Sequence, residues 1–345
     1  VIPYYEIMNK PALLIVNLGT PDSPSYFNVF KYLREFLMDG RVIDIPAFFR
    51  FILVTLIICP LRSFSSGKIY KQLWDLSGGE SPLLKNTREL TTKLNEAQEK
   101  FNVFYAMRYQ TPSIKSTLAH IQKTNPTDLI VFPLFPHYAS ATSGSVYAEV
   151  TKQLSKEWVI PNFNFISQYY DHPAFIEAWI KTAQNYDIEQ YDKILFSYHG
   201  LPKSQVNKVY KDMQCDGKNC EHEINDDNHY CYKATVYETS KLIADRLNIP
   251  QDKYEVSFQS RLTNNWLEPF SDEVLKSYPA KGIKKVLVFS PAFTADCLET
   301  IIEIGHEYKE LFEESGGQKL DYVESLNFSD AWVQAIIEIV NSKSG

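Results

Sequence analysis

An acidic residue recurs every three or four positions after Phe293. The stretch FTADCLETIIEIGHE contains Asp296, Glu299, Glu303 and Glu307. A step of four residues advances only about 40° around an α-helix, so the three glutamates would form a ladder along one face. Carboxylate oxygens suit hard or borderline divalent cations and hold them loosely enough to pass them along. The spacing therefore indicates a track for cations or protons.

The same acids also have a structural interpretation. Asp296 and Glu299 match a D-x-x-E capping box, and the helix dipole favours acids near a helix N-terminus. Glu303 and Glu307 lie deeper, where no cap needs them, and would then belong to a solvated face. A stretch of π-type winding would align the four-residue steps better, and such segments favour functional sites. The sequence therefore leaves two interpretations of these acids open, a solvated helix face and a track for cations or protons.

A histidine stands where another apolar run ends. LFSYHGLP places His199 at the end of an expected strand, followed by Gly200, which permits an unusual backbone conformation. A lone histidine is more often structural. However, neutral imidazole accepts a proton near pH 7 and binds borderline metals, and a strand-end position favours that use.

Further candidates also follow apolar runs. They are Arg108 and Tyr109 in AMRYQTP, His137 in LFPHYASATSG, and Arg261 with Trp266 in QSRLTNNWLEP. Each alone fits core packing or a surface ion pair. Together they predict a cleft with aromatic walls and a few cations, suited to a flat, anionic, mostly apolar ligand.

Three of the five cysteines fall in one polar insert, MQCDGKNCEHEINDDNHYC. The spacing of Cys215, Cys220 and Cys231 is not a zinc signature, and three thiols leave a tetrahedral site one ligand short unless a histidine joins. A solvated loop with reduced thiols and a metal or cluster site are both open.

The elements that must position these residues occur twice. Four segments of the first half recur in the same order in the second: ALLIVNLGTP with DKILFSYHGLP, FNVFYAMRYQTP with YEVSFQSRLTNN, DLIVFPLFPHYASATSG with KKVLVFSPAFTADCLET, and FNFISQYYDHPAFIEAWIKTA with LDYVESLNFSDAWVQAIIEIV. Continuous apolar runs joined by helix-period segments are typical of parallel strands buried on both faces. The predicted fold class is α/β, with two similar Rossmann-like, doubly wound parallel-sheet domains and a cleft at the carboxyl ends of their strands.

The length of 345 residues fits two such domains. We expect an N-terminal α/β domain at 10–185, a C-terminal α/β domain at 186–328 that carries the acidic helix, and a C-terminal helix at 329–345. The first domain has an extra segment, 40–82, which would overhang the cleft as a lip.

Composition excludes some classes of function and location. A net charge of −7 argues against nucleic-acid binding. The odd number of cysteines and the absence of a signal-peptide pattern predict a cytoplasmic protein. The apolar run FILVTLIICPL, 51–61, has eleven residues and is too short to span a bilayer. It is a buried core helix, the wall of an apolar binding cleft or, with residues 47–50, a peripheral contact with the inner face of the cytoplasmic membrane.

These blocks together resemble the ferrochelatases, which insert ferrous iron into a porphyrin. The similarity covers nearly the whole chain and is most specific in SYHGLP and FTADCLET. It implies a class II chelatase, a lyase of haem biosynthesis, with two Rossmann-like halves. The implied reaction inserts Fe²⁺ into protoporphyrin IX, releases two protons and forms protohaem.

The resemblance also implies residue roles. His199 matches the active-site histidine, a proton acceptor and metal ligand, and Glu299 matches the carboxylate that faces it across the porphyrin. Asp296, Glu303 and Glu307 match supporting acids and the metal or proton track on a π-helix. The residues matched to the porphyrin pocket are Leu18, Arg108, Tyr109, Ser140 and Trp266.

The chain departs from the family pattern in places. Cys297 stands where many members carry histidine. Some bacterial relatives hold a 2Fe-2S cluster with four cysteines in a similar insert. Because Cys215, Cys220 and Cys231 number only three, we expect no cluster and no required cofactor.

Other functions stay open. Coproporphyrin is an alternative substrate, although the apolar lip favours protoporphyrin. A related cobalt or tetrapyrrole chelatase would generally be shorter and lack the lip, and a two-lobed haem-binding protein would not need the histidine and the acid ladder. The expected partners are porphyrin and ferrous iron, without nucleic acid, and the oligomeric state is open.

Overall fold

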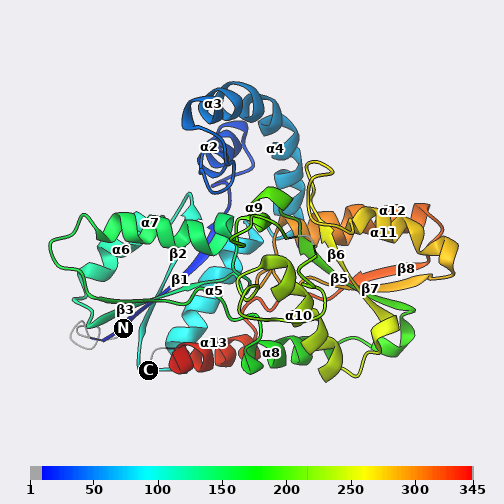
Figure 1. The fold of residues 1–345 in the computed structure, drawn as a ribbon. Helices are drawn as coiled ribbons and strands as arrows, with labels where there is room; N and C mark the ends of the chain where they lie inside the picture. Colours follow the sequence, from blue (N-terminus) through cyan, green and yellow to red (C-terminus); the bar gives the residue numbers. More distant parts are fainter. Residues whose placement is uncertain (1–9, 216, 344–345) are drawn as a thin grey trace. The chain divides into compact units, whose positions relative to one another are not determined.

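The computed structural model describes residues 10–215 and 217–343. Its described residues form two four-stranded sheets in which every pairing is parallel (Figure 1). The first sheet has the order β2-β1-β3-β4, with strands β1 (Ala12–Gly19), β2 (Asn102–Tyr109), β3 (Asp128–Pro133) and β4 (Asn162–Phe165). The second has the order β6-β5-β7-β8, with strands β5 (Lys193–His199), β6 (Tyr254–Gln259), β7 (Lys285–Phe289) and β8 (Lys319–Tyr322).

The two sheets have the same topology, since in both the first strand along the chain pairs with the second and the third. Each strand overlaps one of the repeated apolar segments. The physical reason is burial on both faces, which requires side chains of both strand faces to be apolar. The α/β fold class and the internal duplication are therefore confirmed.

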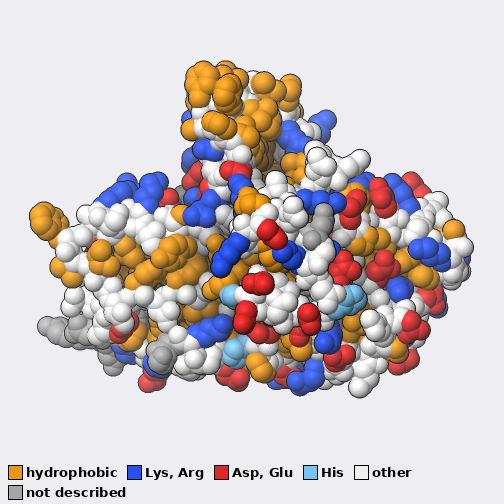
Figure 2. Space-filling model, in the orientation of Figure 1, with side chains coloured by type: hydrophobic (Ala, Val, Ile, Leu, Met, Phe, Trp, Pro, Cys, Tyr) orange, Lys and Arg blue, Asp and Glu red, His pale blue; other side chains and the backbone are white. Residues whose placement is uncertain are grey.

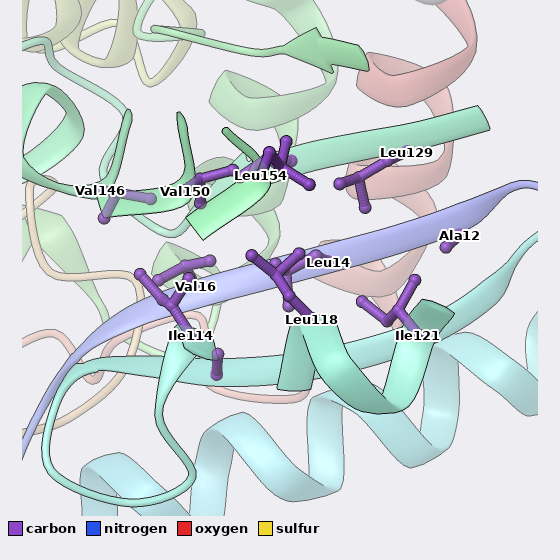
Figure 3. Packing of buried hydrophobic residues seen from close by; sticks show 12 residues of the cluster. Ala12, Leu14, Val16, Ile114, Leu118, Ile121, Leu129, Val146, Val150 and Leu154 are labelled. Atoms are coloured by element: carbon purple, nitrogen blue, oxygen red, sulfur yellow. The ribbon is translucent and has the colours of Figure 1, made fainter. Parts of the chain in front are cut away.

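Helices connect the strands of the first sheet. They are α2 (Tyr26–Leu37), α3 (Ala47–Phe51), the π-helix η1 (Ile52–Ile58), α4 (Cys59–Leu76), α5 (Pro82–Ala97), α6 (Ile114–Gln122), the π-helix η2 (Ser140–Gly144) and α7 (Ser145–Leu154). Alternate residues of β1, including Leu14 and Val16, pack with Leu118 of α6 and Val150 of α7 (Figure 3). Burying these side chains stabilises one face of the sheet by about 1.5–3 kcal/mol for each large aliphatic residue.

The second sheet is connected in a similar way. Its helices are α8 (Pro173–Ala183), η3 (Ile188–Gln190), α9 (Lys203–Asn207), α10 (Tyr232–Arg246), η4 (Gln251–Lys253), α11 (Ser271–Ser277), η5 (Pro279–Lys281), the π-helix η6 (Glu299–Tyr308), α12 (Lys309–Glu314) and α13 (Asp330–Lys343). Leu275 of α11, Ile304 of η6 and Phe312 of α12 pack on Leu195 of β5 and its neighbours. In both sheets a π-helix therefore begins the crossover that follows the third strand.

The boundary between the two units differs from the predicted division at residue 185. One unit contains 1–135, 140–167 and 340–345, and the other contains 136–139 and 168–339. Helix α8 belongs to the second unit because its aromatic residues pack there, Phe175 against Trp332 and Trp179 against Phe289. Residues 329–339 of the expected separate C-terminal helix also pack within the second unit.

The extra segment of the first unit forms a continuous helix, Ala47–Leu76, that packs against α2. Its apolar side chains are unusually exposed, and Figure 2 shows hydrophobic atoms gathered over these elements. The exposed residues are Phe27, Phe48, Phe49, Phe51, Leu56, Ile57, Leu61 and Phe64, here called the apolar lip.

The prediction that this segment is too short to span a bilayer is wrong. The eleven-residue apolar run is part of a helix of 30 residues that includes a window of mean hydropathy 1.8. By length and composition alone this helix is able to cross a membrane. Only 17% of that window is buried, so the expectation of a buried core helix is also wrong for most of its surface.

Candidate functional site

His199 is the last residue of β5, and its ring is presented in a defined tautomer. The ring Nδ1 lies 2.7 Å from the carbonyl oxygen of Gly200. A carbonyl oxygen only accepts hydrogen bonds, so Nδ1 carries the proton in the neutral ring. The lone pair is then on Nε2, where it can accept a proton or bind a cation.

Two aromatic side chains flank this imidazole. The ring centroids of Trp266 and Phe293 lie 6.2 and 6.5 Å from that of His199. Trp266 is held by a short antiparallel bridge to Pro202, so the segments after β5 and β6 support each other. His199 and Trp266, predicted as separate candidates, therefore lie close together beyond β5 and β6.

Gly200 has a different role from the one expected. It is not among the glycines with positive φ, so it does not need a left-handed backbone. Instead, a Cβ at this position would lie 3.0 Å from the Gln259 carbonyl oxygen and 3.2 Å from Trp266 Cε3. The glycine allows the backbone after His199 to approach β6 and the indole closely.

Asp296 does not form the expected capping box with Glu299. Its buried carboxylate accepts hydrogen bonds from Thr300 Oγ1 at 2.9 Å, Asn327 Nδ2 at 2.7 Å and the Ser325 N–H at 3.3 Å. The Thr300 hydroxyl oxygen accepts from the Cys297 N–H at 3.0 Å and so fills the capping role. Asp296 thus fixes the start of the acidic helix to the loop after β8.

The predicted π-type winding is confirmed, because Glu299–Tyr308 forms a π-helix. Within it Glu303 is held by four hydrogen bonds. Oε1 accepts from the Ser260 N–H and the Tyr308 hydroxyl, both at 2.9 Å, and Oε2 accepts from Gln259 Nε2 at 3.0 Å and Ser260 Oγ at 2.5 Å. A carboxylate has about four lone-pair sites, so protein donors occupy all of them.

The hydrogen bonds to Glu303 explain the strained backbone of Ser260. Ser260, directly after β6, has a φ of 62°, a left-handed conformation that costs a non-glycine residue about 1–3 kcal/mol. Both its N–H and its hydroxyl donate to Glu303. The charged acceptor therefore offsets the strain and anchors the end of β6 to the π-helix.

The two other glutamates are more accessible. Glu299 is half-buried and Glu307 is exposed. Partial burial, followed by repulsion from Glu303 and Glu310, raises the pKa of Glu307 above its usual value. Burial first, and then the Glu299 carboxylate, raise the pKa of the neighbouring Cys297 thiol.

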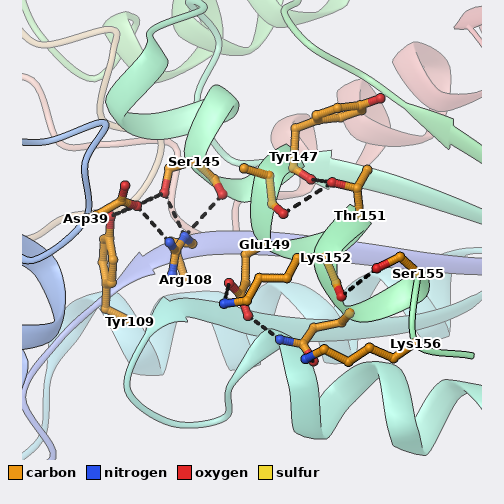
Figure 4. A network of polar contacts seen from close by, with 12 residues as sticks. Asp39, Arg108, Tyr109, Ser145, Tyr147, Glu149, Thr151, Lys152, Ser155 and Lys156 are labelled. Atoms are coloured by element: carbon orange, nitrogen blue, oxygen red, sulfur yellow. Dashed lines mark hydrogen bonds and ion pairs between the residues drawn. The ribbon is translucent and has the colours of Figure 1, made fainter. Parts of the chain in front are cut away.

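The first unit contains a separate polar cluster around Arg108 (Figure 4). Arg108 Nη2 lies 2.7 Å from Asp39 Oδ2, and its Nε donates to Ser145 Oγ at 2.7 Å. Tyr109 OH and Ser145 Oγ also donate to Asp39. Burial disfavours the charge, but the bonds from Ser145 and the Arg41 N–H, with the Arg108 guanidinium, hold the pKa of Asp39 below its usual value.

The residues matched to a porphyrin pocket in this unit differ in exposure. Leu18, Arg108 and Ser140 are half-buried, and Ser140 Oγ accepts from Arg41 Nη1 at 2.9 Å. Tyr109 has no exposed surface, so direct contact with a ligand would require movement of its neighbours. Gly19 is needed beside it, because φ is 109° and a Cβ would lie 1.9 Å from the Tyr109 carbonyl oxygen.

Two other candidates have structural roles. His137 is buried, bonds to Thr239 Oγ1 at 2.9 Å, and has its pKa lowered to about 3 by burial. Arg261 pairs with Asp272 and Glu273 and stacks on Phe270.

Comparison with known proteins identifies the family. A family model described as Ferrochelatase matches residues 10–344. The chain belongs to the ferrochelatase family. The resemblance and the predicted enzyme class, a metal chelatase among the lyases, are thereby confirmed.

Curated ferrochelatases match over nearly their whole length. The ferrochelatase of Legionella pneumophila (strain Corby) is 40% identical over 97% of this chain and 99% of its own. That of Coxiella burnetii (strain Dugway 5J108-111) is 40% identical over 96% of this chain and 93% of its own.

Solved structures share the fold. SirB from Bacillus subtilis with Fe³⁺ has a TM-score of 0.56 at 12% identity and covers 97% of this chain and 96% of its own. The sirohydrochlorin chelatase SirB from Bacillus subtilis subspecies spizizenii, in complex with cobalt, has a TM-score of 0.54 at 11% identity and covers 97% and 95%. At these identities the likeness concerns the fold alone.

Several residues around the ferrochelatase candidates were absent from the sequence-based prediction. Asp39 and Ser145 bind Arg108, Gln259 and Ser260 bind Glu303, and Asn327 binds Asp296. The sequence signal for the Glu303 partners was the polar pair QS at the end of an apolar run, and none marked Asp39, which is 69 residues from Arg108.

Proposed function

We propose that this chain inserts Fe²⁺ into protoporphyrin IX with release of two protons to form protohaem. The proposal is supported by membership of the ferrochelatase family and by one feature of the site. That feature is the His199 tautomer, which directs a basic nitrogen away from the Gly200 carbonyl. Iron is a substrate in this reaction, and the proposal requires no resident cofactor.

His199 serves as the proton acceptor in this proposal. A free-base porphyrin carries two N–H groups whose protons must leave as the dication binds, so charge is conserved. Nε2 accepts a pyrrole proton because Nδ1 already donates to Gly200. A macrocycle bent against Trp266 would expose its N–H groups. A site that binds this bent form stabilises the transition state more than the planar ground state.

Asp296 and the three glutamates of η6 divide into two roles. Glu299 and Glu307 would carry the cation or the released protons, because both carboxylates retain solvent exposure. Asp296 and Glu303 are positioning residues, because hydrogen bonds from the protein engage their oxygens. This division narrows the predicted metal set of His199, Glu299, Asp296, Glu303 and Glu307 to three direct ligands.

The residues matched to porphyrin contacts are described for each unit by itself. Trp266 offers an indole face beside His199 in the second unit. In the first unit Leu18 and Arg108 are the penultimate residues of β1 and β2, and Ser140 is the first residue of η2. The exposed Arg41 beside Ser140 adds a cation for a propionate. Tyr109 would act by orienting Asp39 and Arg108.

The apolar lip supports protoporphyrin and a peripheral membrane location. Protoporphyrin carries two carboxylates and partitions into lipid more readily than tetracarboxylate coproporphyrin. One side of the lip helix is buried, with Val54, Cys59 and Ser63 inaccessible, so this helix belongs to the folded unit. We therefore place the lip at the interface of the cytoplasmic membrane, on the inner face, rather than across it.

The test is an anaerobic incubation of the wild-type protein with each porphyrin and a panel of divalent metals. Loss of free-porphyrin fluorescence reports insertion. Fe²⁺ insertion into protoporphyrin should be fastest. Preference for coproporphyrin would correct the substrate, preference for cobalt with a corrin precursor would indicate the related chelatases, and binding of haem without insertion would reject the enzyme.

A further inference from the structure

Three thiols converge in the insert between α9 and α10. The Sγ atoms of Cys215, Cys220 and Cys231 all lie within 4.8 Å of one another. Cys220 and Cys231 are buried, Cys215 is half-buried, and none forms a disulfide. Tetrahedral zinc has Zn–S bonds of about 2.3 Å, which places its thiolates about 3.8 Å apart. Slight contraction of the group would therefore enclose one ion.

A helix N-terminus, a tyrosine hydroxyl and an ammonium group lie around these thiols. Cys231 is the N-cap residue of α10, a helix of 15 residues, whose dipole favours a thiolate at this end. The Tyr210 hydroxyl lies 2.9 Å from Cys220 Sγ. Lys233 lines the same pocket as Cys215, and its ammonium group pairs with Glu221 at 2.6 Å.

The group also has access to solvent. A pocket of about 390 Å³ is lined by residues that include Cys215, Glu221 and Lys233. It provides an entry path for an ion and room for water, or another small donor, at the fourth coordination position.

We propose that Cys215, Cys220 and Cys231 bind one thiophilic divalent cation of the zinc type, separate from the substrate iron. The ion would organise the insert and fix it to the first turn of α10. That turn matters for the site, because the next residue, Tyr232, donates from its hydroxyl to the His199 carbonyl oxygen at 3.0 Å.

An iron-sulfur cluster does not fit the same residues. A 2Fe-2S cluster takes four protein ligands, two on each iron. Among residues 10–215 and 217–343, no fourth cysteine, histidine, aspartate or glutamate joins the group. Three ligands would also have to divide between two irons, which places at least one thiolate farther away, whereas these thiols are mutually close. A single ion satisfies both observations.

Metal content tests the proposal directly. Full-length protein is produced with zinc in the medium, gel-filtered and measured by mass spectrometry of the metal. We expect about one zinc ion per chain in the wild type, and at least a tenfold loss in Cys215→Ser and Cys220→Ser. Cys59→Ala, a buried cysteine outside the group, should retain the ion. His199→Ala should also retain it, which separates this site from the substrate site.

Cobalt gives a second measurement that reports the ligand type. Co²⁺ added to metal-free wild-type protein should produce thiolate-to-cobalt charge-transfer absorption, which is absent in Cys220→Ser and which carboxylate or imidazole ligation does not produce. Zinc should also slow amide exchange in residues 208–231 at least tenfold. Wild-type protein without zinc and without the cobalt band would overturn the proposal. Visible absorption of an iron-sulfur cluster with acid-labile sulfide would also overturn it, as would equal exchange with and without zinc.

Discussion

At the scale of single residues, the role of each candidate side chain depends on which of its atoms already form hydrogen bonds within the protein. Nδ1 of His199 is committed to a carbonyl oxygen, so its basic nitrogen is Nε2. All lone pairs of Glu303 accept from the protein, so this acid has a positioning role despite its place in the ladder. Residue type and spacing cannot distinguish such cases, because hydrogen-bond partners come from other elements.

Glu303→Gln tests the anchoring of Ser260. The amide keeps the shape of the carboxylate but offers one acceptor oxygen, so at least one donor from Ser260, Gln259 or Tyr308 loses its partner. We expect the protein to lose about 2 kcal/mol of stability against urea. Glu313→Gln, an exposed change in α12, should alter stability by less than about 0.5 kcal/mol. Equal urea midpoints of unfolding for the two variants would contradict the proposed anchoring of Ser260 by Glu303.

The raised pKa of Glu307 predicts a pH-dependent stability. A carboxyl group with a higher pKa in the folded state binds protons more readily there, so its contribution is lost as pH rises from below 4.5 through the folded pKa. Glu307→Gln should therefore stabilise the protein at pH 7 and have no such effect near pH 4. Because the group is exposed, we expect less than about 1 kcal/mol. Thermal melts at both pH values check this, and a destabilised variant at pH 7 would contradict the sign.

At the scale of elements, the acids and the π-helix are separable. Both units begin the crossover after the third strand with a π-helix, η2 and η6, so the winding belongs to the shared architecture. Only η6 carries the glutamates, whereas η2 reads SATSG. The acidity therefore belongs to the second unit's chemistry rather than to the fold.

Glu307→Gln also tests whether this acidic face carries iron. If it forms part of a track, the KM for Fe²⁺ should rise severalfold while the KM for porphyrin stays constant, because only cation delivery is weakened. Glu310→Gln, on the exposed surface of α12, is the matched control. An unchanged KM for Fe²⁺ would favour the solvated face.

At the scale of the whole molecule, the sequence predicted the strands better than the contacts. All eight strands overlap the repeated apolar runs, because burial on both faces leaves a strong local signal. The division by contacts differs from the predicted boundary at residue 185, because Phe175 and Trp179 of α8 pack on residues more than 100 positions away. The contact between Asp39 and Arg108 and the proximity of the three thiols also arise only when the chain folds, so the sequence pattern did not predict them.

The apolar lip predicts association with lipid. Ile57→Glu places a charge among the exposed apolar side chains of the lip, and we expect partition onto anionic liposomes to fall by roughly tenfold, equivalent to about 1.4 kcal/mol. Val159→Glu, at a more exposed apolar residue outside the lip, should leave co-sedimentation unchanged. Equal sedimentation of the two variants would argue against membrane contact.

The central claim is that Nε2 of His199 accepts the pyrrole proton, and His199→Ala tests it most directly. Under anaerobic conditions with saturating Fe²⁺ and protoporphyrin, we expect kcat to fall by about 10²–10⁴, while porphyrin binding, followed by fluorescence, changes little. His120→Ala, an exposed histidine of α6, should keep wild-type activity. Near-normal iron insertion by folded His199→Ala protein would contradict the account.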